Sequence, residues 1–363
     1  MRSFTASWAA VLLCAAAAGA PAGDSADIAE KLKKSFAAVK AIDTHSHLRS
    51  FDELRARADP QRGFTLRHLW TNSYLTWVIS IPAWKPDADF DAWWSQTQAA
   101  FDDVRAMSFY RYMLPAFRGL YGVDFERLSP EEARRLNDRV AANYRNPHWM
   151  EEAVVRRANI ELVLVDGHGR LRWDADYRFT VPVLNVNGLV KGTSPERYAD
   201  SLRQGKGDSP YVFAHERGLT IRSLNDYLAV IDAIFREAMA KGAVCLKTTL
   251  AYQRTLRFED VPRARAEQAF GKSPEALGAG EQKDFEDFIV WHVTRLAARH
   301  DLPFQIHTGH ARIQDPNPLL LGNLLEANAK PKFVLLNGGY RWVGETGALA
   351  TQVGIVWVAY AGR

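Results

Sequence analysis

Short, nearly continuous apolar runs alternate with helical stretches through the second half of this 363-residue chain. We expect strands at residues 40–46, 160–166, 178–185, 243–250, 303–309, 332–339 and 354–361. Amphipathic helical patterns separate the later ones, at residues 224–242, 284–301 and 319–330. Apolar strands separated by helices are typical of a parallel sheet that is covered on both faces. Seven of them fit either a doubly wound sheet or a (β/α)₈ barrel.

Two observations favour the barrel. The glycines Gly167 and Gly169 follow a strand but lack the third glycine and the following helix of a dinucleotide-binding loop. Polar side chains that can bind metals stand at the carboxyl ends of several expected strands, which is where (β/α)₈ barrels build their active sites. We therefore predict an α/β fold of the (β/α)₈ type.

Residues 50–155 differ from the rest of the chain in composition and periodicity. They hold six of the eleven tryptophans and show helical periodicity. Ser129, Pro130 and the acids after them have the pattern of a helix start, with serine as the N-cap. We predict a mainly helical, aromatic-rich insertion after the first strand, within one barrel domain that runs over residues 23–363.

Residues 1–22 have the pattern of a secretory signal peptide, with Arg2 before an apolar run and small residues around Ala20. That run, about eleven residues long, is too short to cross a bilayer. We expect export to the periplasm or the medium, and no integral membrane segment after cleavage. Cys14 would leave with the signal, so Cys245 has no partner for an intramolecular disulfide.

The charge distribution argues against a nucleic-acid partner. The chain has 46 Lys and Arg against 42 Asp and Glu, and the cations are scattered among the acids. No basic run is interleaved with aromatic residues as a nucleic-acid surface requires. We expect a small-molecule substrate and no nucleic acid, and aromatic-rich insertions of this kind suit a homodimer contact as well as a lid.

The first expected strand carries Asp43, His45 and His47. Successive side chains of a strand alternate between faces, so these three share a face, with the imidazoles about 7 Å apart along the strand. Two such imidazoles can converge on one ion, and zinc suits imidazole nitrogen. A divalent metal, with zinc as the expected ion, is therefore the predicted cofactor.

Lys247 lies within an apolar strand, in phase with Cys245. Lysine is rarely buried, and a buried lysine has a lowered pKa that makes its amine nucleophilic. The alternative is a lysine at an exposed strand end that pairs with a loop. We expect Cys245 to be a small apolar filler rather than a nucleophile.

Three further residues follow strands. His307 ends one expected strand and Asn337 ends the next, where Gly338 and Gly339 allow a tight turn. His168 also follows a strand and is a weaker candidate for the site.

H-x-H on the first strand, lysine on the fourth and histidine on the fifth resemble the amidohydrolase superfamily of metal-dependent (β/α)₈ enzymes. The segments AIDTHSHL, CLKTTLAYQRTL, PFQIHTGH and FVLLNGGYRWVGETGALA are similar to its amidohydrolase-related (amidohydrolase 2) branch. Within that branch they resemble uronate-isomerase-like proteins and the amidohydrolase domain joined to glutamine-synthetase-like proteins. The resemblance covers residues 38–48 and 155–361.

The resemblance implies roles for particular residues. His45, His47 and His307 match the metal ligands, and Lys247 matches a lysine that is carboxylated to bridge two metals in some members. A single metal without carboxylation is equally compatible with this branch.

The residues after the fourth and sixth strands are expected to bind substrate. Tyr252 and Arg254 are placed for an anionic group, because arginine suits a carboxylate bidentately, and Tyr340 is a further substrate-binding candidate. Asn337 is expected to orient substrate together with them, and Lys247 and Asn337 are the candidate catalytic residues.

Two departures from the family pattern affect the mechanism. Asn337 stands where a metal-binding histidine ends the sixth strand in many members, and an amide is a poor zinc ligand. The family's eighth strand ends in an aspartate that serves as general base, whereas this sequence stops at Arg363, directly after the seventh expected strand. We therefore expect a barrel of seven strands that is incomplete at its carboxyl end.

Three functions remain open on this basis. The first is hydrolysis of an amide, ester or lactone of a small carboxylate-bearing substrate by metal-activated water. The second is isomerisation of a sugar acid, or decarboxylation, on the same scaffold. The third is an inactive barrel or a binding module.

Overall fold

The computed structural model describes residues 22–167, 171, 173, 175–204, 209–311, 315–354 and 356–359. The expected signal cleavage near Ala22 and the candidate His168 fall at or beyond the edge of these ranges, because residues 1–21 and 168–170 lie outside them. Its strands are β1 (Ala41–Ser46), β2 (Ile160–Asp166), β3 (Thr180–Asn185), β4 (Leu246–Thr248), β5 (Phe304–His307), β6 (Phe333–Leu336) and β7 (Val356–Ala359).

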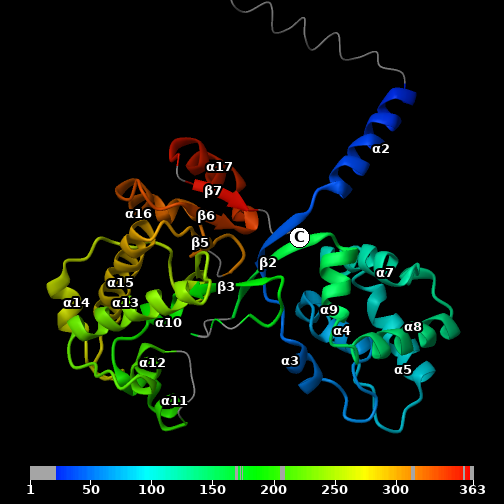
Figure 1. Ribbon diagram of the computed structural model, residues 1–363, viewed down its shortest axis with the longest axis horizontal. Coiled ribbons are helices and arrows are strands. Elements are labelled where there is room, and N and C mark those ends of the chain that lie inside the picture. The colour runs from blue at the N-terminus through cyan, green and yellow to red at the C-terminus, as the bar shows by residue number, and fades with distance from the viewer. Residues whose placement is uncertain are drawn as a thin grey trace, which may run out of the picture.

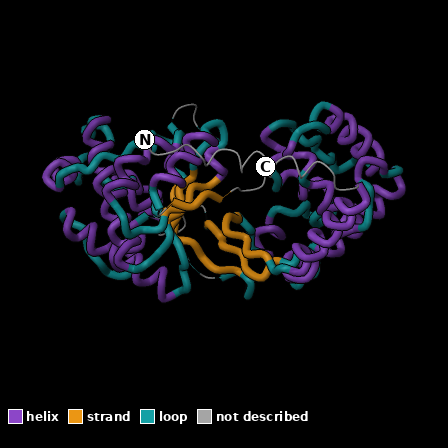
Figure 2. The backbone as a smooth tube through the Cα atoms, turned by 90° about the horizontal axis from the view of Figure 1, so that it is seen from above, coloured by secondary structure: helices purple, strands orange, loops and turns teal. Residues whose placement is uncertain are grey.

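These seven strands form one sheet in which spatial order equals chain order, and each neighbouring pair is parallel. The sheet is curled, as a contact between two strands that are not neighbours shows. Gln305 Nε2 on β5 donates to the Thr44 carbonyl on β1 at 2.9 Å. Figure 2 shows the strands between two groups of helices. The predicted α/β fold of the barrel type, with seven parallel strands, is confirmed.

Every strand except β2 is shorter than expected, and β4 is shortened most. The Ala243 amide donates to Ala238 at 2.9 Å, which extends the end of the preceding helix, and residues after Thr249 turn into a 3₁₀ helix. Only Leu246–Thr248 therefore pair as β4. β1 ends at Ser46 after a register shift, so His47 lies just beyond the strand rather than within it.

Helices of the β3–β7 half lie around these strands (Figure 1), and buried apolar side chains of both form one core. The longest are α13 (Leu224–Ala240) and α15 (Ala279–Arg299). Ser223 and Asp226 form a capping box that starts α13. The remaining elements are α10 (Asn187–Val190), η4 (Pro195–Tyr198), α11 (Ala199–Gln204), α12 (Pro210–Glu216), η5 (Leu250–Tyr252), α14 (Arg263–Ala269), η6 (Pro318–Leu321), α16 (Gly322–Ala327), η7 (Asn337–Gly339) and α17 (Val343–Gln352).

The chain between β1 and β2 is helical, as expected for the insertion. Ser129 caps its longest helix, with Pro130 at the first position and Glu132 completing the capping box. Its helices are α3 (Phe51–Ala56), α4 (Leu66–Thr71), η1 (Tyr74–Trp77), α5 (Phe90–Asp102), α6 (Ser108–Arg111), α7 (Met113–Tyr121), η2 (Phe125–Arg127), α8 (Pro130–Asn143), α9 (Trp149–Glu151) and η3 (Glu152–Arg157).

The insertion has a hydrophobic core of its own. Trp70, Trp93 and Trp94 are each at most 2% exposed, and their rings pack on one another with centroids 5.9 to 6.3 Å apart. Val163 of β2 and Phe179 beside β3 belong to the same cluster, so one part of the sheet is packed against the insertion. The insertion is thus a second packed body beside the sheet.

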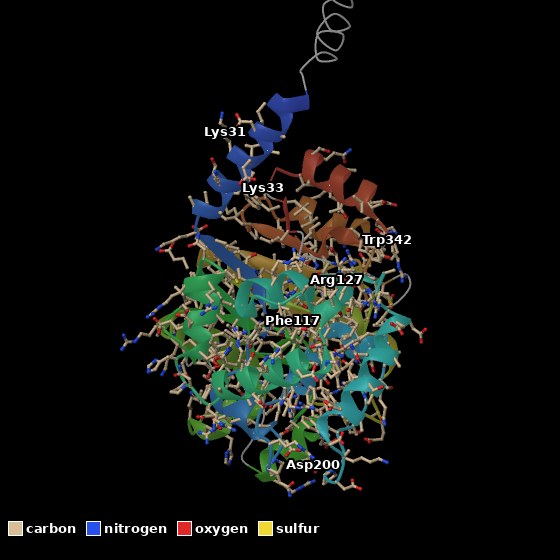
Figure 3. The ribbon with its side chains drawn as sticks, turned by 90° about the vertical axis from the view of Figure 1, so that its right-hand side faces the viewer. Lys31, Lys33, Phe117, Arg127, Asp200 and Trp342 are labelled. Carbon is tan, nitrogen blue, oxygen red and sulfur yellow. The ribbon has the colours of Figure 1, made fainter. Side chains whose placement is uncertain are left out.

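Helix α2 (Ala22–Ala38) precedes β1 and extends beyond the rest of the described chain, as Figures 1 and 3 show. Its apolar side chains Ile28, Leu32 and Phe36 are more than half exposed. Within the ranges given above, no helix combines the length and the apolar character that a membrane crossing requires.

Candidate active site

Side chains at the carboxyl ends of six strands face one edge of the sheet. Because all strands are parallel, their carboxyl ends lie at this common edge, where barrel enzymes carry their sites. The register places Asn185 beside Lys247 and Lys247 beside Gln305. The edge carries His45, His47, Asp166, Asn185, Lys247, His307 and Asn337.

His45 and His47 lie together. Their ring centroids are 5.6 Å apart with an edge-to-face angle of 70°. His47 Nδ1 lies 3.3 Å from the Asp166 backbone carbonyl, a contact that can orient the ring. The Asp43 carboxylate accepts from the His45 amide at 3.0 Å, so it supports the backbone beneath the pair.

His307 is held by two contacts of its own. Its Nε2 atom lies 2.5 Å from the His310 carbonyl, and Asn337 Nδ2 lies 2.9 Å from its Nδ1. A carbonyl can only accept, so Nε2 carries the proton and Nδ1 accepts from the amide of Asn337. Tyr252 packs on the same ring, with centroids 4.5 Å apart.

The arrangement partly fits the predicted metal ligands. Two imidazoles at the spacing of His45 and His47 suit one borderline ion. His307 makes both ring contacts with protein atoms. Within the described ranges, no three His, Cys, Asp or Glu side chains are gathered closely enough to hold a metal. The histidine pair is therefore a two-ligand arrangement here, with His307 directed towards Asn337 and His310.

Lys247 is fully buried, as predicted, and its Nζ atom has no hydrogen-bond partner among the residues that the structure describes. Burial lowers the pKa of Lys247 to about 8, against a smaller opposing effect of the Asp166 charge. Burial also raises the pKa of the Cys245 thiol to about 12, which agrees with a packing role for that side chain. A lysine with this pKa is partly uncharged near neutral pH.

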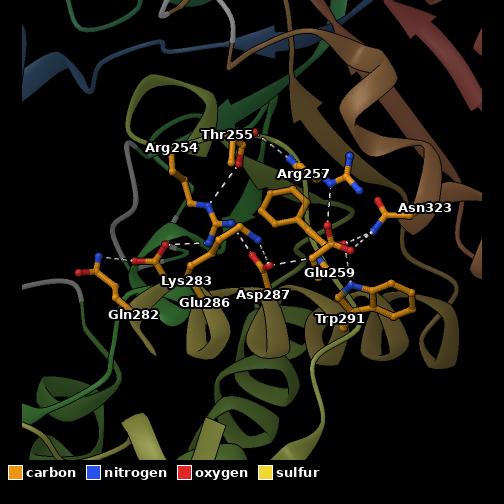
Figure 4. A network of polar contacts seen from close by, with 11 residues as sticks. Arg254, Thr255, Arg257, Glu259, Gln282, Lys283, Glu286, Asp287, Trp291 and Asn323 are labelled. Carbon is orange, nitrogen blue, oxygen red and sulfur yellow. Dashed lines mark hydrogen bonds and ion pairs between the residues drawn. The ribbon is translucent and has the colours of Figure 1, made fainter. Parts of the chain in front are cut away.

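Arg254 lies in a buried ion-pair network (Figure 4). Its guanidinium is 10% exposed, donates to Glu286 Oε2 at 2.8 Å and also pairs with Asp287. Lys283 contacts Asp287 as well. The predicted role of Arg254 in binding an anion stays a prediction, but two carboxylates of α15 already occupy its guanidinium.

The two tyrosines predicted to bind substrate are exposed. Tyr252 is 42% exposed next to His307, and Tyr340 is 52% exposed after β6. The backbone of Tyr340 adjoins Gly309, so the loops that follow β5 and β6 touch.

Sequence reasoning missed two polar residues of this edge. Asp166 is 3% exposed and ends β2, and Asn185 Nδ2 donates to both of its carboxylate oxygens at 3.1 and 3.2 Å. Both stand at a strand end after an apolar run, which is the signal that identified His307. It also missed Trp77 of the insertion, whose ring stacks on His310 at 5.5 Å. No local pattern could predict a contact between segments so far apart.

Neither a protein-family model nor a curated protein matches the sequence. Solved structures do match it. A uronate isomerase from Thermotoga maritima aligns with a TM-score of 0.60 and 14% identity, over 88% of this chain and 75% of that chain.

Two further structures agree. A glucuronate isomerase from Caulobacter crescentus aligns with a TM-score of 0.59 and 16% identity, over 88% of this chain and 73% of that one. A protein assigned as a metal-dependent hydrolase, from Lactobacillus casei ATCC 334, aligns with a TM-score of 0.54 and 17% identity, over 91% of this chain and 75% of that one. This chain has the uronate-isomerase fold. The resemblance drawn from the sequence motifs is therefore confirmed at the level of the fold.

Proposed function

We propose that the chain is a metal-dependent hydrolase that acts on an amide, ester or lactone of a small substrate. The observation that carries this proposal is the pair of imidazoles, His45 and His47, whose ring centroids are 5.6 Å apart at the same carboxyl edge of the sheet that carries the buried Lys247. The solved structures support an enzyme scaffold, and one of them is assigned as a metal-dependent hydrolase.

His45 and His47 would hold the ion, and His307 would join them on releasing a ring contact. A bound divalent ion, zinc by our proposal, supplies Lewis acidity that polarises a carbonyl group and acidifies water.

The chain's own residues prepare the edge for this chemistry. Asn185 donates to the Asp166 carboxylate and keeps it in place beside Lys247. Lys247 exchanges a proton near neutral pH because burial has lowered its pKa to about 8. Asn337 holds the His307 ring in one orientation. The buried position of Asp166 and Lys247 keeps bulk water from competing for these groups.

The test is metal stoichiometry in variant proteins. The double variant His45→Ala/His47→Ala should lose bound zinc, measured by elemental analysis after dialysis against a zinc buffer. His148→Ala, which removes an exposed histidine of the insertion, should keep the stoichiometry of the parent chain. Unchanged zinc content in the double variant would overturn the proposal. His307→Ala, measured alongside, should bind zinc more weakly if His307 is the third ligand.

A second candidate is isomerisation of a sugar acid. It is favoured by the two isomerase structures, which align with higher TM-scores than the hydrolase. The products that the zinc-loaded chain forms distinguish the two reactions. Ketose formation from D-glucuronate or D-galacturonate would establish the isomerase, whereas release of acid from amides, esters or lactones would establish the hydrolase. Turnover of neither substrate set would count against both.

A further inference from the structure

Exposed aromatic rings gather around the loop that follows β5. Trp77 is 54% exposed and Tyr74 is 43% exposed, although both belong to an insertion whose other tryptophans are largely buried. Tyr252, at the end of η5 after β4, is 42% exposed. Single exposed apolar side chains are common on proteins, whereas a contiguous group indicates a binding surface.

Contacts between side chains and through the His310 backbone connect these rings into one row. Tyr74 packs on Trp77 with centroids 5.0 Å apart, and Trp77 stacks on His310 at 5.5 Å with an angle of 17°. The His310 carbonyl contacts the ring of His307, on which Tyr252 packs at 4.5 Å. The row therefore runs from the insertion, across the β5 loop, to the carboxyl end of β4.

The local structure of the insertion holds Trp77 in this place. Ser73 caps η1 by accepting from the Leu75 amide at 3.2 Å, and its hydroxyl donates to the Trp70 carbonyl at 2.7 Å. Leu75, which lies between Tyr74 and Trp77 in the sequence of η1, is fully buried. The buried leucine anchors the turn, so that Tyr74 and Trp77 stand towards the β5 loop without being part of the core.

We propose that Tyr74, Trp77 and Tyr252 form an aromatic subsite that binds the face of a ring in the substrate. The proposal rests on the proposed function, because it takes the carboxyl edge of the sheet as the place of reaction. Aromatic faces bind other rings in offset or edge-to-face arrangements, and they offer a large apolar area on a rigid side chain. The ligand class is therefore a compound with a ring face, either an aromatic ring or the C–H face of a sugar.

The experiment measures binding of three probes to the zinc-loaded chain by titration calorimetry. Phenylacetate carries an aromatic ring, D-glucuronate carries a sugar ring and acetate carries none. We expect at least one ring probe to bind about tenfold more tightly than acetate. Trp77→Ala should remove about that factor, and Trp77→Phe, which keeps an aromatic face, should retain most of it. Phenylacetate and D-glucuronate together show which ring is preferred.

Controls separate this proposal from the previous one. Phe36→Ala removes an aromatic ring that is 73% exposed on α2 and should change no affinity. Tyr74→Ala should weaken ring binding in the same direction as Trp77→Ala, and zinc content should be unchanged in all of these variants. Wild-type affinity in both Trp77→Ala and Tyr74→Ala, or ring probes that bind no better than acetate, would overturn the subsite. If His45→Ala/His47→Ala kept its zinc, the metal proposal would fail, but the affinity for the ring probes should still depend on Trp77.

Discussion

Lys247 shows how much one residue can constrain the site. Its side chain has no exposure, and within the described part of the chain its ammonium group has no hydrogen-bond partner. This arrangement costs folding free energy whenever the amine is protonated. A pKa lowered to about 8 relieves only part of this cost. If position 247 had only a structural role, an apolar side chain there would give a more stable fold.

We therefore expect Lys247→Met to stabilise the metal-free chain. The unfolded chain keeps the ordinary lysine pKa of 10.5, so between pH 8 and 10.5 it binds a proton that the folded chain has released. The free energy of unfolding of the wild type should rise by roughly 3 kcal/mol across this window, while below pH 8 the penalty is full and constant.

Urea unfolding of wild type and Lys247→Met at pH 7.5 and pH 10 checks this. The stability gap in favour of the variant should narrow at the higher pH. Lys33→Met, on the exposed face of α2, should give a curve parallel to that of the wild type. A gap that does not change with pH would contradict a buried, partnerless amine.

Asn337 is the second residue whose role can be measured directly. Asn337→Asp places a carboxylate where the amide now contacts His307 Nδ1, and a neighbouring negative charge favours the protonated imidazole. The pKa of His307 should therefore be higher in this variant than in the parent chain when both are free of metal. NMR titration of the ring nitrogens reads this shift. Asn146→Asp, an exposed change in the insertion, should leave that pKa where it is; an equal pKa in both variants would refute the contact.

At the scale of elements, the loops after β5 and β6 support each other. Gly309 has φ of +80°, and a Cβ atom there would lie 2.5 Å from the backbone nitrogen of Tyr340 and 2.8 Å from the carbonyl carbon of Gly339. Backbone cannot yield as a flexible side chain can. Glycine at this position is what allows the loop carrying His310 to lie against the turn after Asn337.

Gly309→Ala should therefore destabilise the chain by at least about 2 kcal/mol, from the left-handed conformation and the overlap together. Thermal or urea unfolding gives the value. The matched change Gly347→Ala lies in α17, where a Cβ atom meets nothing within 4 Å, and should stabilise by about 0.5–1 kcal/mol. Similar effects of the two substitutions would show that the loops are not in close contact.

The segment after β4 is attached to α15 by Arg254. Removing one member of a buried charge group leaves the others without compensation, so Arg254→Met should cost about 3 kcal/mol of unfolding free energy. Arg105→Ala, which removes a pair in which both side chains are about half exposed or more, should cost less than about 1 kcal/mol. Unchanged stability with weaker binding of D-glucuronate would instead favour the anion-binding role predicted from the sequence.

At the scale of the whole molecule, two hydrophobic cores meet in the sheet. One surrounds α13 and α15, and the other fills the insertion but includes Val163 of β2 and Phe179 beside β3. Because both cores bury residues of the same sheet, loss of packing in one should weaken the other.

Trp70→Ala tests this coupling. Trp70 is 1% exposed at the centre of the insertion core, and its truncation should cost about 3–5 kcal/mol. Unfolding followed by tryptophan fluorescence, to which the insertion contributes five of the ten remaining tryptophans, should coincide with unfolding followed by circular dichroism. Two separated transitions would show that the insertion folds independently of the sheet.

Sequence alone determined the order of the strands, the helices between them and the helical insertion. These follow from periodicities of two and 3.6 residues and from capping patterns such as the one at Ser129, all of which are local. It also identified the strand ends that carry His45, Lys247 and His307, since parallel strands place their carboxyl ends at one edge. The bounds of the strands were predicted less accurately. Ala243, for example, was expected in β4, but its amide donates to the Ala238 carbonyl at the end of the preceding helix.

Only the tertiary structure decided how side chains at that edge are used. Whether Arg254 meets a ligand or Glu286 depends on where α15 packs, and the orientation of His307 depends on Asn337, thirty residues away in sequence. The stacking of Trp77 on His310 joins an insertion to a loop more than two hundred residues later. Such contacts depend on the packing of distant segments, and no local pattern in the chain carries that information.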